Sequence, residues 1–165
     1  MKVATKLTIF TPTFLIILFL DQYSKIFAID NLKGSLPQNY LGGLFRLIYA
    51  ENKGAWGSLG ASWGYPWREI ILIYVPLLVL VGLIIYLLFS WNNTKMELIA
   101  YSLIATGGIS NLIDRMRFNY VVDFLYIGWK SLGTNIFNIA DMAIMTGFFI
   151  LVYYQYVKYK LDHKK

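Results

Sequence analysis

Residues 107–141, GGISNLIDRMRFNYVVDFLYIGWKSLGTNIFNIAD, place more polar and ionisable side chains beside strongly apolar sequence than any other part of the chain. Asp114, Asp123 and Asp141 are three of the nine acidic residues in the protein, and apolar runs flank all three. A carboxylate at the edge of a bilayer is costly unless it is paired or hydrated, so such residues usually serve a function. The stretch therefore predicts a functional site. The alternative is a set of helix-end charges that extend to the lipid headgroups.

The composition indicates a membrane protein. The chain has 165 residues, 58% of them hydrophobic, and a net charge of +6. Because the basic residues gather at the chain ends and beside apolar runs, we expect them to meet anionic lipid headgroups and not nucleic acid. The chain has no cysteine and a single histidine, His163, which excludes a disulfide framework, a thiolate nucleophile and a histidine-rich metal site. Carboxylate, amide, lysine and arginine groups remain for any chemistry.

Four apolar stretches are long enough to cross a bilayer, at residues 7–29, 69–90, 96–113 and 138–158. The first has the look of a signal peptide, but no small-x-small cleavage site follows it, so we expect an uncleaved span. We expect Pro76 to kink the second span, and Gly107 and Gly108 to let another helix approach the third closely. The predicted fold is a polytopic α-helical membrane protein, with residues 1–165 forming a single membrane-embedded domain.

The segments outside these spans, residues 30–68 and 114–137, contain stretches typical of strands. Residues 44–50 follow two glycines and are rich in large and β-branched side chains, as are residues 120–127 around Asp123. Trp63, Tyr65 and Trp67 are amphipathic aromatic residues of the kind that prefer the membrane–water interface. We therefore expect a small extramembrane β-cradle and an interfacial helix on the outer side.

Four spans place both termini on one side of the membrane, and both outer segments with all three carboxylates on the other. The two sides carry nearly equal numbers of lysine and arginine, but those on the terminal side are packed into fewer residues near the helix ends. Such positive charge favours the cytoplasmic side. We therefore expect cytoplasmic termini and a site near the outer leaflet.

Polar residues recur at helical spacing near the ends of the spans, where i, i+3 and i+4 positions share one helix face. These groups are Asp21 with Lys25, then Asn111 with Asp114 and Arg115, and finally Asn138 with Asp141. The last pair opens a helix, where the helix dipole favours an anion. The first pair is open to two interpretations, a functional polar face or a simple interfacial ion pair.

Two carboxylates held close together share a proton, because ionising both is costly. One then acts as a base on a water molecule while the other donates a proton to the substrate carbonyl, which is the arrangement of an aspartic protease and needs no metal, thiol or histidine. The competing hypothesis is a proton or cation relay in a small transporter. The acids lie at helix ends and not at the bilayer midplane, which favours the hydrolase. This reasoning does not choose between the three acids.

Four short motifs lie in order along the chain: DQYSK at 21–25, NKGA at 52–55, NLIDR at 111–115 with VVDF at 121–124, and FNIAD at 137–141. Together they resemble the motifs of the lipoprotein signal peptidases, the signal peptidase II family of bacterial membrane aspartyl proteases. Each motif alone is weak, but four in order on a four-span chain are specific. The likeness extends along nearly the whole chain.

The resemblance implies roles for individual residues. The catalytic pair would be Asp123 and Asp141, with no cofactor and no metal. The substrate-binding residues would be Asn52, Gly54, Asn111, Arg115 and Asn138, and the structural support would come from Asp21, Lys25, Asp114 and Ala140. The Asp21–Lys25 pair would tie the first helix to the strands. A homologue without catalytic activity that served only for binding or structure should lose an acid of the pair, and this chain keeps both.

The family acts in the bacterial cytoplasmic (inner) membrane. Its substrate is a prolipoprotein whose cysteine already carries diacylglycerol, and it cuts just before that cysteine. Globomycin-like cyclic peptides inhibit it, and membrane lipid surrounds the reaction. This chain departs from the family pattern at Trp56, Ser110 and Met142. We expect these departures to affect the shape of the substrate pocket and its inhibitor affinity, and not the catalytic pair.

Overall fold

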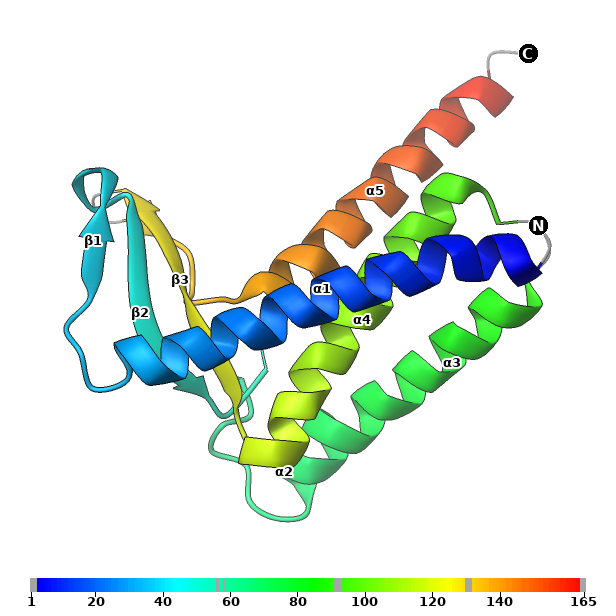
Figure 1. The fold of residues 1–165 in the computed structure, drawn as a ribbon. Coiled ribbons are helices and arrows are strands. Elements are labelled where there is room, and N and C mark those ends of the chain that lie inside the picture. Colours follow the sequence, from blue (N-terminus) through cyan, green and yellow to red (C-terminus); the bar gives the residue numbers. More distant parts are fainter. Residues whose placement is uncertain (1–2, 56, 58, 91–92, 130–131, 164–165) are drawn as a thin grey trace.

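A computed structural model describes residues 3–55, 57, 59–90, 93–129 and 132–163. Long helices form a bundle, and a four-stranded sheet lies at one end of it, while both termini lie at the other end (Figure 1). In chain order the elements are α1 (Val3–Leu32), β1 (Gln38–Tyr40), η1 (Leu41–Gly43), β2 (Phe45–Asn52), α2 (Trp67–Glu69), η3 (Ile70–Tyr74), α3 (Val75–Phe89), α4 (Lys95–Phe118), β3 (Val121–Trp129), β4 (Leu132–Gly133) and α5 (Ile139–Asp162).

Four helical segments are long and apolar enough to cross a membrane, which confirms the predicted architecture. They are Val3–Leu32, Trp67–Phe89, Lys95–Phe118 and Ile139–Asp162. In the apolar window of α4 half of the residues are buried inside the protein, against 6–17% in the other three segments. The helix α4 is therefore the centre of the bundle, and the other three leave most residues of their apolar windows outside the buried core.

The helix α4 extends beyond the predicted third span, which ended at residue 113. It continues to Phe118 and ends at Asn119, whose left-handed backbone (φ 62°) is typical of a helix C-terminus. The predicted span ended where the apolar run ends, although the spacing of Asn111, Asp114 and Arg115 placed all three on one helix face. In the structure Asp114 is buried and hydrogen-bonded, so the helix has no reason to end there.

The second spanning segment changes helix type just before Pro76. Its first turn, Trp67–Glu69, is α-helical, Ile70–Tyr74 form a π-helical turn, and the α-helix resumes at Val75. Proline has no N–H to donate and its ring crowds the carbonyl four residues earlier, so a wider turn at that point relieves the conflict. Where we expected a kink, the structure thus has a π-helical turn.

The aromatic segment before the second span consists of turns. Residues 59–62 and 65–66 are in turns, and the helix that begins at Trp67 runs directly into the second span. Gly60 adopts a left-handed backbone (φ +80°), which glycine reaches without the steric cost of a side chain. Among the described residues the expected interfacial helix is therefore the first turn of the second span. Trp56 lies outside the described residues.

The sheet is antiparallel, with strand order β1-β2-β3-β4. The strands β2 and β3 confirm the predictions at residues 44–50 and 120–127. Leu47 pairs with Leu125 but Ala50 pairs with Asp123, so β2 has one more residue than β3 between these pairs. Such a bulge bends the strand and changes where nearby side chains point. It lies directly beside Asp123.

Close helix contacts bring α4 against α5. A Cβ atom added at Gly107 would lie 2.4 Å from the carbonyl oxygen of Ala140, and one added at Gly147 would lie 2.5 Å from that of Ala100. Both glycines therefore allow a backbone approach that any side chain would block. The expected role of Gly107 is confirmed. The contact holds the C-terminal half of α4 beside the start of α5, where the polar motifs of both helices meet.

Candidate active site

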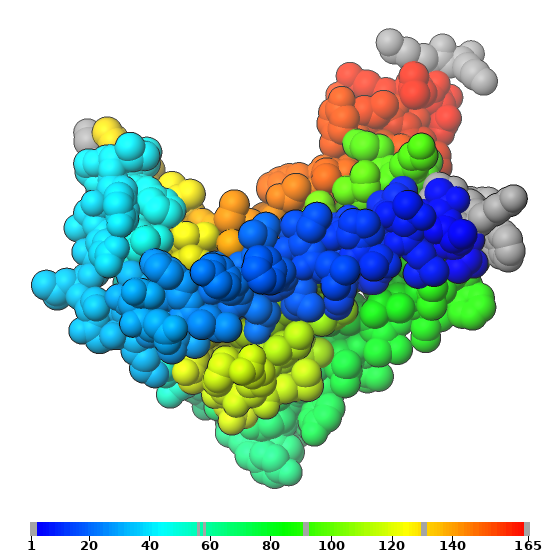
Figure 2. Space-filling view, in the orientation of Figure 1, coloured from blue at the N-terminus to red at the C-terminus, as the bar shows by residue number. Residues whose placement is uncertain are grey.

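A cavity of about 700 Å³ opens between the sheet and the first turns of α5. Figure 2 shows the same region as a hollow between the sheet, in cyan and yellow, and α5, in orange and red. Its polar lining includes Asn52, Asn111, Arg115, Asp123 and Asp141. Its apolar lining includes Phe137, Met142, Ile144 and Met145. The cavity therefore combines two carboxylates with a wall that suits apolar chains.

Each of the four carboxylate oxygens of Asp123 and Asp141 accepts one hydrogen bond from an asparagine. Asn52 Nδ2 donates to Asp123 Oδ2 (3.0 Å), and Asn138 Nδ2 donates to Asp123 Oδ1 (2.7 Å). Asn111 Nδ2 donates to Asp141 Oδ1 (2.8 Å), and the backbone N–H of Asn138 donates to Asp141 Oδ2 (3.2 Å). Three asparagines from separate segments thus hold the two acids at one cavity.

The start of α5 is built as a capping box. Asn138 is the N-cap, and its Oδ1 accepts the N–H of Asp141 (2.9 Å), while Asp141 accepts the N–H of Asn138 in return. This exchange satisfies two backbone donors that a helix start otherwise leaves unpaired. It also fixes Asp141 at the positive end of the helix dipole, as its sequence position predicted. Asn138 is fully buried and contacts both acids.

Burial and the neighbouring carboxylate control the ionisation of Asp123. The side chain belongs to β3 and is almost entirely buried. Burial raises the pKa of Asp123 to about 7, and repulsion from Asp141 adds to the increase, while the hydrogen bonds from Asn52 and Asn138 oppose it. The pair therefore keeps a proton near neutral pH. Because the two acids interact, the pH at which Asp123 loses this proton also depends on the charge of Asp141.

Lys25 is the centre of a second, buried polar network beside the acids. Its ammonium nitrogen lies 2.7 Å from Asp21 Oδ2, 2.9 Å from Asp114 Oδ2 and 2.9 Å from Asn111 Oδ1. Asp21 also accepts the N–H of Ala140 in α5 (2.7 Å). The buried positions of Asp21 and Lys25 exclude a simple interfacial ion pair.

Asp114 connects this network to the sheet. Its Oδ2 accepts the N–H of Val122 in β3 (3.1 Å), and its Oδ1 accepts from Gln22 (2.9 Å). The network therefore joins α1 to α4, α5 and, through Asp114, to β3. Asp114 and Asp123 are both buried, so the interpretation of the acids as helix-end charges reaching the headgroups is wrong.

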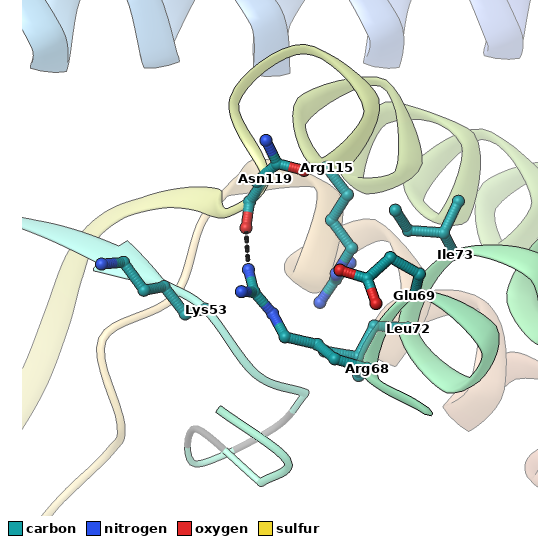
Figure 3. Close-up of a pocket in the computed structure, with 7 residues that line it drawn as sticks. All are labelled: Lys53, Arg68, Glu69, Leu72, Ile73, Arg115 and Asn119. Carbon is teal, nitrogen blue, oxygen red and sulfur yellow. Dashed lines mark hydrogen bonds between the residues drawn. The ribbon is translucent and has the colours of Figure 1, made fainter. Parts of the chain in front are cut away.

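Arg115 lies between the main cavity and a cavity of about 10 Å³ behind it. Figure 3 shows this small cavity, with Arg68, Glu69 and Arg115 around it. Arg115 Nη2 donates to the carbonyl oxygen of Gly54 (2.9 Å), and Arg68 donates to that of Asn119. The two arginines therefore hold the loop after β2 and the turn after α4 at the edge of the site.

The structure brings together the residues singled out in the sequence, and it adds others. Gly54 takes part through its backbone, because its N–H donates to Asn52 Oδ1 (3.1 Å). Gln22 and Ser110 were not predicted as site residues. Gln22 is part of the first motif, and it donates to Ser110 Oγ (3.0 Å), which in turn donates to Asp21 (2.7 Å). Ser110, where this chain differs from the family pattern, thus connects Gln22 to Asp21 within the buried network.

The apolar wall of the cavity had no signal in the sequence. Ile144 and Met145 follow Asp141 in a helix whose apolar residues all look alike, so only the fold shows which of them face the cavity. Met142, noted as a departure, is among them. Its long, flexible side chain adapts to varied apolar partners. Met142, Ile144 and Met145 lie near the carboxylates because they share the first turns of α5 with Asp141.

Comparisons with known proteins identify the family of the chain. A family model for signal peptidase (SPase) II matches residues 13–157. The chain is 31% identical to the lipoprotein signal peptidase of Clostridium acetobutylicum over 90% of its own length and 92% of that protein. It is 38% identical to that of Chlorobium phaeovibrioides over 81% of each chain. A solved bacterial membrane enzyme shares the fold, with a TM-score of 0.76 at 19% identity over 94% of this chain and 91% of that one. The chain belongs to the signal peptidase II family.

Proposed function

We propose that this protein is an intramembrane aspartic endopeptidase that removes signal peptides from diacylglyceryl-modified prolipoproteins, cleaving just before the lipidated cysteine. The observation that carries this proposal is the pair Asp123 and Asp141, which share one cavity and whose four oxygens are all held by asparagine donors. Family membership supports it, because curated relatives are named lipoprotein signal peptidases. It does not support the alternative of a proton- or cation-relay transporter.

The two acids are suited to different halves of the reaction. Asp123 holds its proton near neutral pH, because burial raises its pKa to about 7. Asp141 lies at the positive end of α5, where an anion is favoured. Asp141 therefore takes a proton from the attacking water while Asp123 gives its proton to the carbonyl oxygen of the scissile bond. When the tetrahedral intermediate collapses, Asp141 passes its proton to the leaving nitrogen and Asp123 recovers one from the hydroxyl group.

The cavity suits a substrate that arrives through the membrane. Phe137, Met142 and Met145 give it an apolar wall for the lipid chains or apolar side chains beside the scissile bond. Arg115 lines the same cavity, and a guanidinium has five N–H donors, so it can bind a substrate carbonyl in addition to Gly54. These contacts would hold an extended peptide across the two carboxylates.

The test is cleavage of a diacylglyceryl-modified prolipoprotein by the purified protein in detergent, with a metal chelator present throughout. The matched control substrate is the same precursor without diacylglycerol. We expect cleavage of the lipidated precursor before its cysteine, unaffected by chelator and blocked by globomycin, and little cleavage of the control. Loss of activity with chelator, or equal cleavage of both precursors, would contradict the proposed mechanism or substrate class.

We also infer that the protein spans the bacterial inner membrane with cytoplasmic termini and the site near the outer leaflet. The concentration of lysine near the terminal ends of the helices supports this orientation. Because the chain has no cysteine, single cysteines at Leu36 and Lys158, both exposed, can report it. In spheroplasts, a membrane-impermeant thiol reagent should label Leu36→Cys at once and Lys158→Cys only after lysis. The reverse pattern would overturn the orientation.

A further inference from the structure

The third acceptor of Lys25 links the buried network to the catalytic pair. An ammonium group has three N–H donors, and Lys25 directs them to Asp21, Asp114 and Asn111 Oδ1. The first two contacts form ion pairs that join elements of the fold. The third ends on the residue that donates to Asp141. Two hydrogen bonds, through Asn111, therefore connect Lys25 to Asp141. The ion pairs of Lys25 do not account for this connection.

This connection between Lys25 and Asp141 depends on the orientation of the Asn111 side-chain amide. Asn111 Oδ1 accepts from Lys25 (2.9 Å) and from Asn138 Nδ2 (3.1 Å), and Asn111 Nδ2 donates to Asp141 Oδ1 (2.8 Å). Reversing the amide would set its N–H donors against an ammonium group and its oxygen against a carboxylate. Both contacts would then be repulsive, because an ammonium group only donates and an ionised carboxylate only accepts.

The other two asparagines of the site are oriented by the backbone. Asn52 Oδ1 accepts the N–H of Gly54 (3.1 Å), and Asn138 Oδ1 accepts the N–H of Asp141 (2.9 Å). Either amide keeps its orientation as long as its loop or helix start is folded. Of these three amides, Asn111 is the one whose oxygen is held by a charged side chain.

We propose that Lys25 is a positioning residue of the reaction: its ammonium group fixes the Asn111 amide so that an N–H is always presented to Asp141. Without Lys25 only Asn138 Nδ2 still donates to the Asn111 oxygen, so the amide reverses more readily and then presents its oxygen, which is compatible only with a protonated Asp141. Lys25 thereby keeps Asp141 available as the base. This inference rests on the proposed function, because it assumes that Asp141 is the base.

The net charge near Asp141 can be kept constant when Lys25 is replaced. In the part of the chain that the structure describes, the charged side chains around Asp123 and Asp141 are Asp21, Lys25, Asp114 and Arg115, which come from α1 and α4. Removing Lys25 alone would leave Asp21 and Asp114 buried without their cation, which endangers the fold. Removing Asp21 and Lys25 charges together keeps the total charge of the wild type.

The experiment compares Asp21→Asn with the double variant Asp21→Asn/Lys25→Met. Both lose the ion pair within α1, but only the double variant loses the contact with Asn111. The readout is the pH profile of kcat/KM on the lipidated precursor. The acid limb is the fall in kcat/KM at low pH, where the base becomes protonated. We expect Asp21→Asn to keep it at or below its wild-type position. The double variant should move it upward by about one pH unit or more, because a carboxylate that loses a hydrogen-bond donor to its charged form ionises less readily.

The outcomes separate this inference from the proposed function. If the wild type cleaves and the double variant keeps the wild-type acid limb, Lys25 has only a structural role and the inference is wrong. If the wild type does not cleave, the proposed function itself fails. Should the double variant not fold, the comparison of Asp114→Asn with Lys25→Met/Asp114→Asn tests the same contact, because Asp114 is the second ion-pair partner of Lys25.

Discussion

Replacing Asp123 or Asp141 with asparagine should reduce cleavage of the lipidated precursor by at least about 100-fold, the lower end of what general acid–base groups contribute. Each substitution removes a group that must gain or lose a proton during the reaction. The amide has nearly the same shape as the carboxylate, so packing in the cavity changes little. The measurement is the initial rate of cleavage by each purified variant at saturating precursor, with thermal unfolding in detergent to confirm that the variants are folded.

A matched control is available on the same sheet. Glu51 in β2 pairs with Lys33 (3.0 Å) at the protein surface, so Glu51→Gln makes a similar chemical change away from the cavity. It should keep the wild-type rate. If Asp123→Asn also cleaved at the wild-type rate, the assignment of that residue would be wrong, and Asp114 would be the next acid to test.

Activity should fall about tenfold per pH unit above pH 7. Asp123 must hold a proton to donate it, and the pKa of Asp123, raised from 3.8 to about 7, sets the pH at which that proton is lost. The measurement is kcat/KM of the wild type between pH 5 and 9, with product quantified by mass. The control is the same precursor incubated without enzyme. A rate that stayed constant up to pH 9 would show that the protonated form of Asp123 is not required.

The same pKa has a consequence for stability. A carboxyl group with a raised pKa binds its proton more tightly in the folded than in the unfolded protein, so its ionisation opposes folding. The free energy of unfolding should therefore decrease as the pH rises from about 4 to about 7, the window between the unfolded and folded values of Asp123. Asp123→Asn should lack this part of the pH dependence, because an amide does not titrate in that window.

The amino-acid order was sufficient for the spans, the two longer strands and the local helix motifs. Long apolar runs can hide their backbone polar groups in a bilayer only as helices, so hydropathy predicted all four. Spacing placed Asp21 with Lys25 and Asn138 with Asp141 on shared helix faces, and both pairs are in contact. These features depend on neighbours along the chain, which is why they are visible without the fold.

The short strands β1 and β4 were not predicted, because each is only two or three residues long and forms by pairing with a longer neighbour. The choice among the three acids was also not accessible from spacing, and it came from the family resemblance. The structure gives a physical reason for it. The oxygens of Asp114 accept from Lys25, Gln22 and the N–H of Val122, so they are occupied within the buried network.

Asp123 and Asp141 have a different environment, because they lie at one cavity on elements that meet only when the chain folds. The bulge in β2 beside Asp123, the glycine contact between α4 and α5, and the cap at Asn138 act together to place them. Local sequence could predict which groups were available for chemistry. Which of them share a proton, and which are neutralised by Lys25, depends on long-range contacts and burial, since these set the cost of each charge.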